Sequence, residues 1–491
     1  MIKDVLIQLS VFLSLTALVG FITWLHCRKA ARSTDTTKEY FLANSGLNWM
    51  FIAGSITLTN INTDTLVGWN GNQMLLIMWW ELAAVLGLIL LAEIFVPIYY
   101  KYNCTTVTEL LERRYNNKHI RATVATIFLL GNVFLFLPAM LYTSSLIIKS
   151  MFGLPPTLAG IDTILVLSTF TAVVGAAYAI IGGLRAVAIS DTYSGIIVLG
   201  LAMLVVFLAL NAVHWSFAGI PAERLTMIGD SKSVLPWPTL FTGMMFTQLY
   251  YWSTNQTITQ RALAAPSIRE AKKGVYGSAV IRLFIIPPMI AIPGVCAFKL
   301  YGNIGDQAYG RLVGDVLPHW LMGAFAAAMF AAVMTSYNAT LNSSAALYVC
   351  DLHQKYVKRQ GNIARLSMWV SFGFALLSIT LVPLYEGAPS IIQRIQSWLG
   401  LFSMPILSAF ITGLLFRNVD ARAVIATIMF GTGLYAFFTF IWTPLHFLHL
   451  MFITVWACVG FALLLNRVVF GRRAELEVTK IGRVLRAALS S

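Results

Sequence analysis

Apolar runs of about 20 residues, the length that a helix needs to cross a bilayer, recur along nearly all of this 491-residue chain. Only 11% of its residues are charged, whereas a soluble domain normally carries about a quarter. The sequence therefore predicts an all-α, polytopic membrane protein. We predict thirteen spans, at residues 5–26, 47–72, 73–100, 121–149, 158–181, 187–213, 238–262, 274–299, 318–350, 367–384, 392–416, 421–442 and 445–466.

The flanks of the first span predict the orientation of the chain. One lysine precedes this span and the basic run RKAAR follows it. A cleaved signal peptide has the reverse polarity, so we interpret the span as a retained helix whose N-terminus faces outward. Thirteen spans from that start place 26 of the 34 Lys and Arg residues in cytoplasmic loops or the tail, in agreement with the positive-inside rule. We expect a multi-pass protein of the cell membrane with its C-terminus in the cytoplasm.

The net charge of +14 and the five cysteines narrow the class of protein further. The positive charge follows from the topology and matches an anionic inner leaflet, so it does not indicate nucleic-acid binding. The cysteines have no paired spacing, which argues against a disulfide framework or a zinc site. No nucleophile, metal or phosphate-loop pattern indicates an enzyme, and no feature indicates an obligate protein partner.

The order of the spans predicts an inverted repeat. Because each group of five spans is odd in number, the two groups enter the membrane from opposite sides. Each group opens with a span that polar residues interrupt, GSITLTNINTDT at 54–65 and QLYYWSTNQTITQ at 248–260. The predicted parts are a leading helix with a basic loop (1–46), a first repeat (47–213), a second repeat (238–416), two accessory spans (421–466) and a basic tail (467–491).

Interrupted first helices in corresponding places indicate a binding site near the middle of the membrane. Backbone groups that leave helical pairing are costly in hydrocarbon unless something satisfies them, so an unwound segment implies a wet cavity or a bound ion. The alternative is that the polar residues only join neighbouring helices. The second polar run, at the corresponding place one repeat later, favours an interrupted helix over this alternative.

The ninth span carries a candidate cation site. Ala332, Thr335 and Ser336 stand at i, i+3 and i+4, so one carbonyl and two hydroxyls can share a helix face. Together with free carbonyls of the interrupted second span they would form an oxygen cage without a full charge, which favours a monovalent ion. We interpret it as a sodium site. The alternative is that the two hydroxyls bond to the preceding turn of their own helix.

Glu81 and Arg282 are the charges most clearly placed within predicted spans, and such charges are usually functional. They either pair with each other as structure or line a wet pocket and bind solute hydroxyls by charge-assisted hydrogen bonds. Arg282 could instead attract a carboxylate substrate. The sequence leaves these alternatives open.

Several stretches resemble the sodium/solute symporter family over most of the chain, and the run through YYW and QRALAA is the most specific. They are KEYFLANSGLNW (38–49), TVTELLERRY (106–115), GGLRAV with Asp191, YYWSTNQTITQRALAA (250–265), LNSS and IQSWLGL (395–401). The resemblance implies a leucine-transporter-like fold, a five-plus-five inverted repeat with a discontinuous first helix in each repeat. It also implies which residues of this chain bind sodium and solute.

The family's sodium ligands fall on the carbonyls of Leu58, Ile61 and Ala332 and the hydroxyls of Thr335 and Ser336. Asp191 matches an acidic residue that assists sodium on its way to the cytoplasm. The sugar-contacting positions fall on Asn60, Thr65, Glu81, Gln248, Tyr251, Arg282 and Gln396. Thr65, Gln248 and Arg282 depart from the family's residue types, whereas the other four positions match them. The resemblance therefore implies a polyhydroxyl solute and leaves the particular sugar open.

Three aromatic residues match the gates of the family. Trp69 and Trp80 align with an outer hydrophobic gate, and Tyr251 aligns with an inner one that stacks on the sugar ring. Aromatic rings cover the apolar faces of sugars, but Trp and Tyr are also ordinary interfacial anchors. Both interpretations stand at this point.

These features predict a sodium-coupled secondary active symporter that imports a small polar solute, a sugar or polyol, by alternating access. Within the same class, a carboxylate or amino-acid symporter is the alternative. Outside this class, one alternative is a solute-sensing membrane receptor, although the tail of some twenty residues leaves no room for a signalling domain. The other is a channel, which would conduct without coupling to sodium. Expected partners are the solute, sodium and the lipid bilayer.

Overall fold

The computed structural model describes residues 10–11, 14, 17–18, 21–22, 25, 42, 45–61, 63–158, 160–357, 362–386 and 390–477. Most of the predicted leading helix and loop, and the end of the tail, lie outside these residues. Within the described part, nine helical segments are long and apolar enough to cross a membrane, and the apolar helices Trp49–Leu58 and Thr163–Ala176 are shorter. The chain is therefore a multi-pass membrane protein, and the count of thirteen spans stays a prediction.

The first half of the molecule is helical apart from one short hairpin, and η2, η4 and η5 are π-helical while η3 is a 3-10 helix. Its elements are α3 (Trp49–Leu58), η2 (Asp64–Gly68), α4 (Trp69–Gly71), η3 (Leu75–Met78), α5 (Trp79–Leu90), η4 (Leu91–Phe95), α6 (Val96–Lys101), α7 (Val107–Tyr115), α8 (Lys118–Gly131), η5 (Asn132–Phe136), α9 (Leu137–Met151), β1 (Thr157–Leu158), β2 (Ile161–Asp162) and α10 (Thr163–Ala212).

The second half is built in the same way, with η7 and η9 as π-helices. Its elements are α11 (Ala222–Leu225), η6 (Trp237–Phe241), α12 (Gly243–Leu249), η7 (Tyr250–Thr254), α13 (Gln256–Leu263), α14 (Ile268–Phe284), α15 (Ile286–Tyr301), η8 (Gly305–Gln307), α16 (Ala308–Val316), α17 (His319–Ala346), η9 (Leu347–His353), α18 (Gln354–Tyr356), α19 (Ile363–Leu381), η10 (Val382–Tyr385), α20 (Ile391–Leu415), β3 (Phe416–Arg417), α21 (Ala421–Phe440), α22 (Phe447–Val468) and β4 (Glu475–Leu476).

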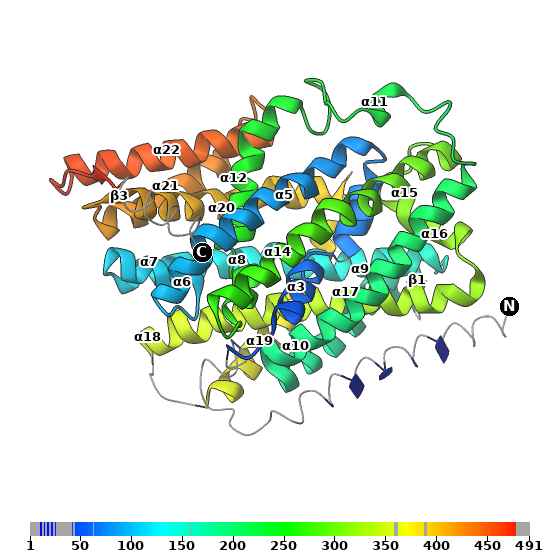
Figure 1. The fold of residues 1–491 in the computed structure, drawn as a ribbon, viewed down its shortest axis with the longest axis horizontal. Coiled ribbons are helices and arrows are strands. Elements are labelled where there is room, and N and C mark those ends of the chain that lie inside the picture. The colour runs from blue at the N-terminus through cyan, green and yellow to red at the C-terminus, as the bar shows by residue number, and fades with distance from the viewer. Residues whose placement is uncertain are drawn as a thin grey trace.

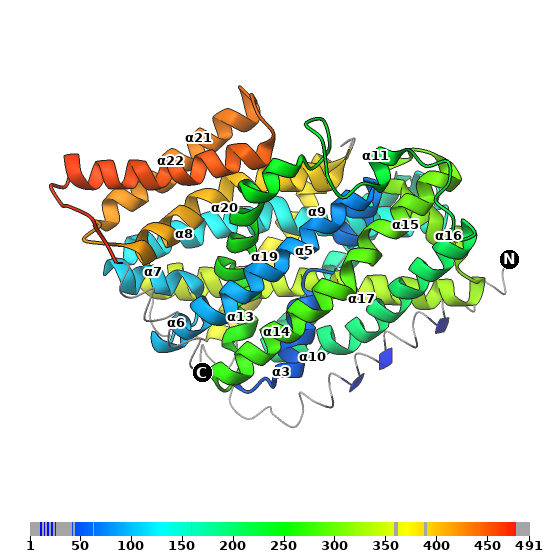
Figure 2. The ribbon, with the colours of Figure 1, turned by 45° about the horizontal axis from the view of Figure 1, so that its top comes forward.

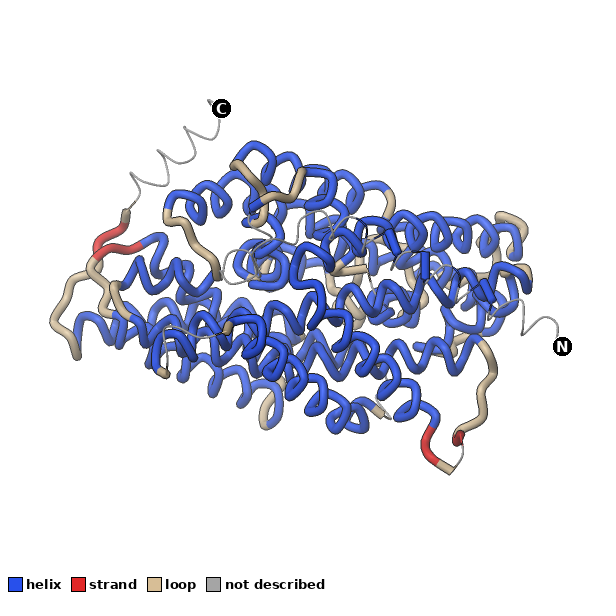
Figure 3. Tube along the Cα trace, turned by 90° about the horizontal axis from the view of Figure 1, so that it is seen from below, coloured by secondary structure: helices blue, strands red, loops and turns tan. Residues whose placement is uncertain are grey.

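The helices form one elongated bundle with two distinct ends (Figures 1 and 2). The short helices α6, α7 and α18 lie at one end, and α11, α16 and β1 lie at the other. Two antiparallel strand pairs mark these ends: β1 pairs with β2 through Thr157 and Asp162, and β3 pairs with β4 through Phe416 and Leu476 (Figure 3). Lys101 of α6 and Arg113 and Arg114 of α7 belong to the first of these ends.

Both polar runs that predict an interrupted helix coincide with a break. After α3 ends at Leu58, the chain makes a turn through Thr59 and Asn60 before the helix resumes near Thr63. Between η7 and α13, Asn255 is extended, and its side chain accepts the Thr257 N–H at 2.9 Å as an N-cap. The symmetry that would relate the two halves as an inverted repeat stays a prediction.

The loop that the sequence predicts around residue 185 is absent, because α10 is helical from Thr163 to Ala212. Both ends of α10 nevertheless lie beside the same neighbours. Ser168 Oγ is 2.8 Å from Ser145 Oγ of α9, while Ala209 packs with α16, which in turn lies against α9 at Ser150. A straight helix of 50 residues would be about 75 Å long. The helix therefore turns back on itself, as two predicted crossings require.

Candidate functional site

A pocket of about 60 Å³ lies beside the two helix breaks; we call it the central pocket. Its walls come from the α3 break and η2, from α5, from α12 and η7, and from α20. Among the sequence-predicted residues it is lined by Asn60, Thr65, Trp69, Trp80, Glu81, Gln248, Tyr251 and Gln396. Its other lining residues are Asp64, Phe136, Thr247, Trp252, Ile392, Ile395 and Leu399.

A short hydrogen bond joins the two broken helices across this pocket. The Tyr251 hydroxyl, in η7, donates to Asn60 Oδ1 in the α3 break at 2.6 Å. The Asn60 carbonyl accepts a hydrogen bond from Thr65 Oγ1 at 2.7 Å. Asn60 is therefore held from both sides, and any movement of Tyr251 acts directly on the unwound segment.

The wall between α5 and α12 is closed by hydrogen bonds within the protein. Gln248 Nε2 donates to the Trp80 carbonyl at 2.9 Å, and Gln248 Oε1 accepts from Trp252 Nε1 at 2.8 Å. Both ends of the Gln248 amide are thus engaged by the protein, and this side chain positions the wall.

The two tryptophans of the predicted outer gate lie against each other. The Trp69 and Trp80 rings are stacked with centroids 4.9 Å apart, and each residue is 6% exposed. They cover one side of the central pocket with a continuous aromatic surface. Because pockets that bury a small-molecule ligand usually measure about 300–1,000 Å³, a solute can enter only when lining side chains move.

Glu81 and Arg282 form a buried ion pair, which is the first of the two alternatives that the sequence left open. The guanidinium also donates to the Thr57 carbonyl at 3.0 Å and lies 4.2 Å from the Trp252 ring centroid. Glu81 lines the central pocket, whereas Arg282 lies behind it and does not line it. The pair thus connects the pocket wall on α5 with the backbone of α3.

One donor and one acceptor on residues that line the central pocket are buried without a hydrogen-bond partner among the described residues. They are Trp80 Nε1, a donor, and Gln396 Oε1, an acceptor. Buried polar groups are almost always paired, and leaving one unpaired costs about 1–3 kcal/mol. Both side chains line the central pocket, and a donor together with an acceptor fits the hydroxyl groups of a solute.

The predicted sodium ligands lie where α17 meets the α3 break. Ser336 Oγ donates to the Thr59 carbonyl at 3.0 Å and lies 3.4 Å from the Leu58 carbonyl. Thr335 Oγ1 donates to the Ala332 carbonyl of its own helix at 2.8 Å. For Thr335 this is the alternative in which the hydroxyl bonds to the preceding turn of its own helix. Ser336 thus contacts the α3 break, while Thr335 and Ala332 are buried beside it on α17.

Ile61 and Asp191 complete the predicted ion path. Ile61 is buried at the break, and its N–H donates to the Leu58 carbonyl at 3.2 Å. Asp191 belongs to α10, but its side chain lies outside the described part. In the described residues, no cluster of three or more His, Cys, Asp or Glu side chains could hold a metal ion.

Sequence reasoning assigned no role to two lining residues, Asp64 and Trp252. Asp64 is part of the interrupted run 54–65, and a carboxylate within an unwound segment was the available signal. Trp252 is part of the specific YYW stretch, and it supports both Arg282 and Gln248. Asp64 belongs to η2 and Trp252 to η7, and the sequence does not state that these elements line one pocket.

Comparison with known proteins identifies the family of this chain. The sequence profile of the sodium:solute symporter family matches residues 40–431. The chain is 33% identical over 484 residues to an uncharacterized symporter, YidK, of Escherichia coli K12, covering 94% of this chain and 83% of that one. It is 26% identical to the sodium/glucose cotransporter of Vibrio parahaemolyticus (89% and 86% covered) and 28% identical to the mouse sodium/myo-inositol cotransporter 2 (81% and 65% covered).

The fold matches solved transporters as well. A sodium-coupled sialic acid symporter in a substrate-bound, outward-open state superposes with a TM-score of 0.79 at 18% identity, over 94% of this chain and 98% of that one. At 18% identity this likeness shows the fold alone. The family is shown by the sequence profile, which matches most of the chain. The chain therefore belongs to the sodium:solute symporter family, whose members are sodium-coupled transporters and not enzymes.

Proposed function

We propose that this protein imports a small neutral polyhydroxyl solute, a sugar or a polyol, together with sodium by alternating access. The observation that carries the proposal is the central pocket, which lies beside both helix breaks and contains an unpaired donor and an unpaired acceptor. Hydroxyl groups donate and accept, so a polyol satisfies Trp80 Nε1 and Gln396 Oε1 at once. Asn60, Thr65, Glu81 and Tyr251 add further polar contacts in this proposal.

The charges of the central pocket favour a neutral solute over a carboxylate. The described residues that line it include two acidic ones, Asp64 and Glu81, and no Lys, Arg or His. The positive charge of Arg282 is already paired with Glu81. A solute carboxylate would meet like charges in a desolvated site, which is unfavourable. Relatives named for glucose and for myo-inositol support the same class.

A carboxylate-bearing solute is the second candidate. Arg282 lies directly behind Glu81, and a solute carboxylate could replace Glu81 as its partner if that side chain moved. The solved relative in the outward-open state is named for sialic acid. A panel of neutral and acidic solutes separates the two candidates.

In the proposed mechanism, sodium binds where Ser336 meets the α3 break. The ligands are the carbonyls of Leu58, Ile61 and Ala332 and the hydroxyls of Thr335 and Ser336. Sodium would fix the unwound segment and so hold Asn60 in position for the solute, which gives positive coupling because the first ligand completes the ordering that both need. Asp191 would assist the release of sodium toward the cytoplasm.

Alternating access needs a gate on each side of the central pocket. We assign the Trp69–Trp80 stack to the outer gate and Tyr251 to the inner gate, with the N-terminus outside and the C-terminus in the cytoplasm. One sodium ion moving down about 100 mV supplies ~2.3 kcal/mol. This energy supports a solute gradient of roughly fiftyfold, since each tenfold step needs about 1.4 kcal/mol.

The substrate class is tested by thermal-shift screening of sugars, polyols and sugar acids, each in sodium and in potassium, followed by uptake into proteoliposomes. We expect a neutral polyol to raise the unfolding midpoint in sodium only, because a ligand stabilises the state that it binds. The same compound should then accumulate only when a sodium gradient is imposed. Flux without that dependence would indicate a channel, binding without flux a sensor, and stabilisation by acids alone the carboxylate symporter.

The sodium site is tested by the double variant Thr335→Ala/Ser336→Ala. It removes both hydroxyl ligands while the carbonyls remain, so we expect at least a tenfold loss of apparent sodium affinity and loss of sodium-driven uptake. Thr340→Ala is the matched control, because that hydroxyl is also buried on α17 but donates to the Ser336 carbonyl of its own helix. Sodium stimulation that survives in the double variant at the wild-type level would rule out the proposed cage.

The buried ion pair predicts how two further variants differ. Glu81→Gln leaves the Arg282 charge without a counter-charge, and breaking such a pair typically costs about 3–5 kcal/mol. We expect a clearly lower unfolding midpoint, and weaker solute binding with little change in sodium affinity. The double variant Glu81→Gln/Arg282→Gln removes both charges and should recover most of the midpoint but not solute binding. An unchanged midpoint in Glu81→Gln, or equal losses of solute and sodium affinity, would contradict these roles.

A further inference from the structure

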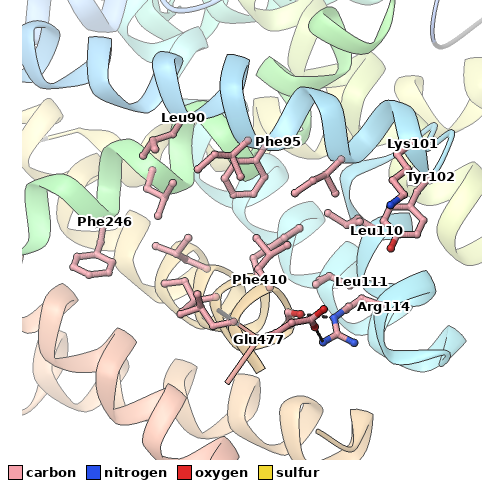
Figure 4. A pocket seen from close by; sticks show the side chains of 18 of the residues that line it. Leu90, Phe95, Lys101, Tyr102, Leu110, Leu111, Arg114, Phe246, Phe410 and Glu477 are labelled. Carbon is pink, nitrogen blue, oxygen red and sulfur yellow. Dashed lines mark hydrogen bonds and ion pairs between the residues drawn. The ribbon is translucent and has the colours of Figure 1, made fainter. Parts of the chain in front are cut away.

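A second, larger cavity of about 410 Å³ lies on another side of the bundle; we call it the lateral groove. Figure 4 shows it between α5 and α6 above, α12 at one side, α7 at the other, and α20 and α22 below. It shares no lining residue with the central pocket. The two cavities use neighbouring residues of α12, Leu249 for the lateral groove and Gln248 for the central pocket.

The lining of the lateral groove is almost entirely aliphatic and aromatic. Examples are Leu90 and Phe95 above, Phe246 at the side and Phe410 below. Trp456, which also lines the groove, is 46% exposed. A polyhydroxyl solute would find few hydrogen-bond partners here, whereas an alkyl chain would bury apolar surface on every side.

One end of the lateral groove is charged. Lys101 and Tyr102 lie together at this end, and both are exposed. Among the described residues no carboxylate lies within ion-pair distance of Lys101. Arg114, by contrast, is held by the carbonyls of Gly413 and Phe416 and by Glu477, and so forms part of the wall. The end thus presents one uncommitted positive charge and a phenol beside an apolar channel.

We propose that the lateral groove is a binding site for one anionic phospholipid, with an acyl chain in the channel and the phosphate at Lys101 and Tyr102. Basic residues at the mouth of a pocket between membrane helices are complementary to anionic headgroups. Lys101 belongs to the end of the bundle that the proposed orientation places at the cytoplasmic leaflet, where such lipids are enriched. The charge and the apolar channel therefore select the same occupant.

The site would couple lipid composition to transport through the helices that it shares with the central pocket. α12 leads directly into η7 with Tyr251, and α20 carries Gln396. An acyl chain packed between α12 and α20 would resist changes in their spacing. This consequence rests on the proposed transport function, but the binding of lipid does not.

The chain's own tail is the competing occupant. Ile481, Val484, Leu485, Ala488 and Leu489 are spaced as one face of an amphipathic helix, and the described chain ends at Glu477, which lines the lateral groove. The anionic lipid is favoured because the uncommitted charge at the mouth is positive and residues 478–491 carry three basic side chains and no acidic one. The variant Leu485→Glu, which breaks the apolar face of the tail, tests this choice.

Native mass spectrometry of the full-length protein, titrated with dioleoyl phosphatidylglycerol or dioleoyl phosphatidylcholine, tests the proposal. We expect the first phosphatidylglycerol to bind more tightly than phosphatidylcholine, and Lys101→Gln to weaken it about fivefold, the factor that one lysine near a headgroup supplies. Ile411→Trp and Leu90→Trp fill the channel from opposite walls, so both should lower the binding of either lipid. Arg269→Gln, which removes an exposed basic residue at the start of α14, should leave binding unchanged.

The contrary outcomes are distinct. Equal binding of the two lipids with no effect of Lys101→Gln would overturn the assignment of an anionic headgroup. Normal binding in both channel-filling variants would show that the acyl chain lies elsewhere. Stronger lipid binding in Leu485→Glu would show that the tail occupies the lateral groove and would also overturn the proposal. Because none of these measurements requires uptake, their failure is independent of the proposed transport function.

Discussion

The structure depends on how the backbone of the α3 break is satisfied inside an apolar bundle. Carbonyls that leave helical pairing in such surroundings must find other donors. Here the donors are side chains from three different elements: Arg282 of α14 for Thr57, Ser336 of α17 for Thr59, and Thr65 of η2 for Asn60. The break is therefore a junction at which separate helices are tied to one short segment.

The candidate site follows from this junction. The groups that satisfy the break are the same groups, or neighbours of the groups, that would meet sodium and solute. Ser336 occupies the proposed ion site, while Arg282 is paired with Glu81 of the pocket wall. Tyr251 extends the network to the second broken helix through Asn60. A ligand that replaces any of these bonds changes how several helices are held, which is the physical basis of coupling in our proposal.

The fold was predictable where the signal is local. Apolar length predicted a multi-pass membrane protein, in agreement with the nine candidate spans of the described residues. The polar runs at 54–65 and 248–260 located both breaks, because unpaired backbone needs polar neighbours. The sequence predicts a loop around residue 185, whereas the structure is helical throughout Thr163–Ala212. Hydropathy reports where a chain crosses a membrane and not how it reverses direction.

Much of the lining of the central pocket was predictable from the sequence, but the contacts within it were not. Resemblance supplied eight residues that line the central pocket, and the mid-span position of Glu81 and Arg282 marked them as important. Their pairing could not be derived, because two isolated charges in a sequence carry no information about their separation. The lateral groove gave no signal at all, since its mostly apolar lining residues come from six helices that are far apart in the sequence.

The central claim is that sodium and solute both act on the α3 break. Hydrogen–deuterium exchange of the backbone amides in residues 57–65, compared in sodium, in potassium, and in sodium with solute, tests it most directly. The account predicts slower exchange in sodium than in potassium and a further slowing when solute is added, with little change at the outer ends of α21 and α22. Exchange at 57–65 that is the same in all three conditions would contradict it.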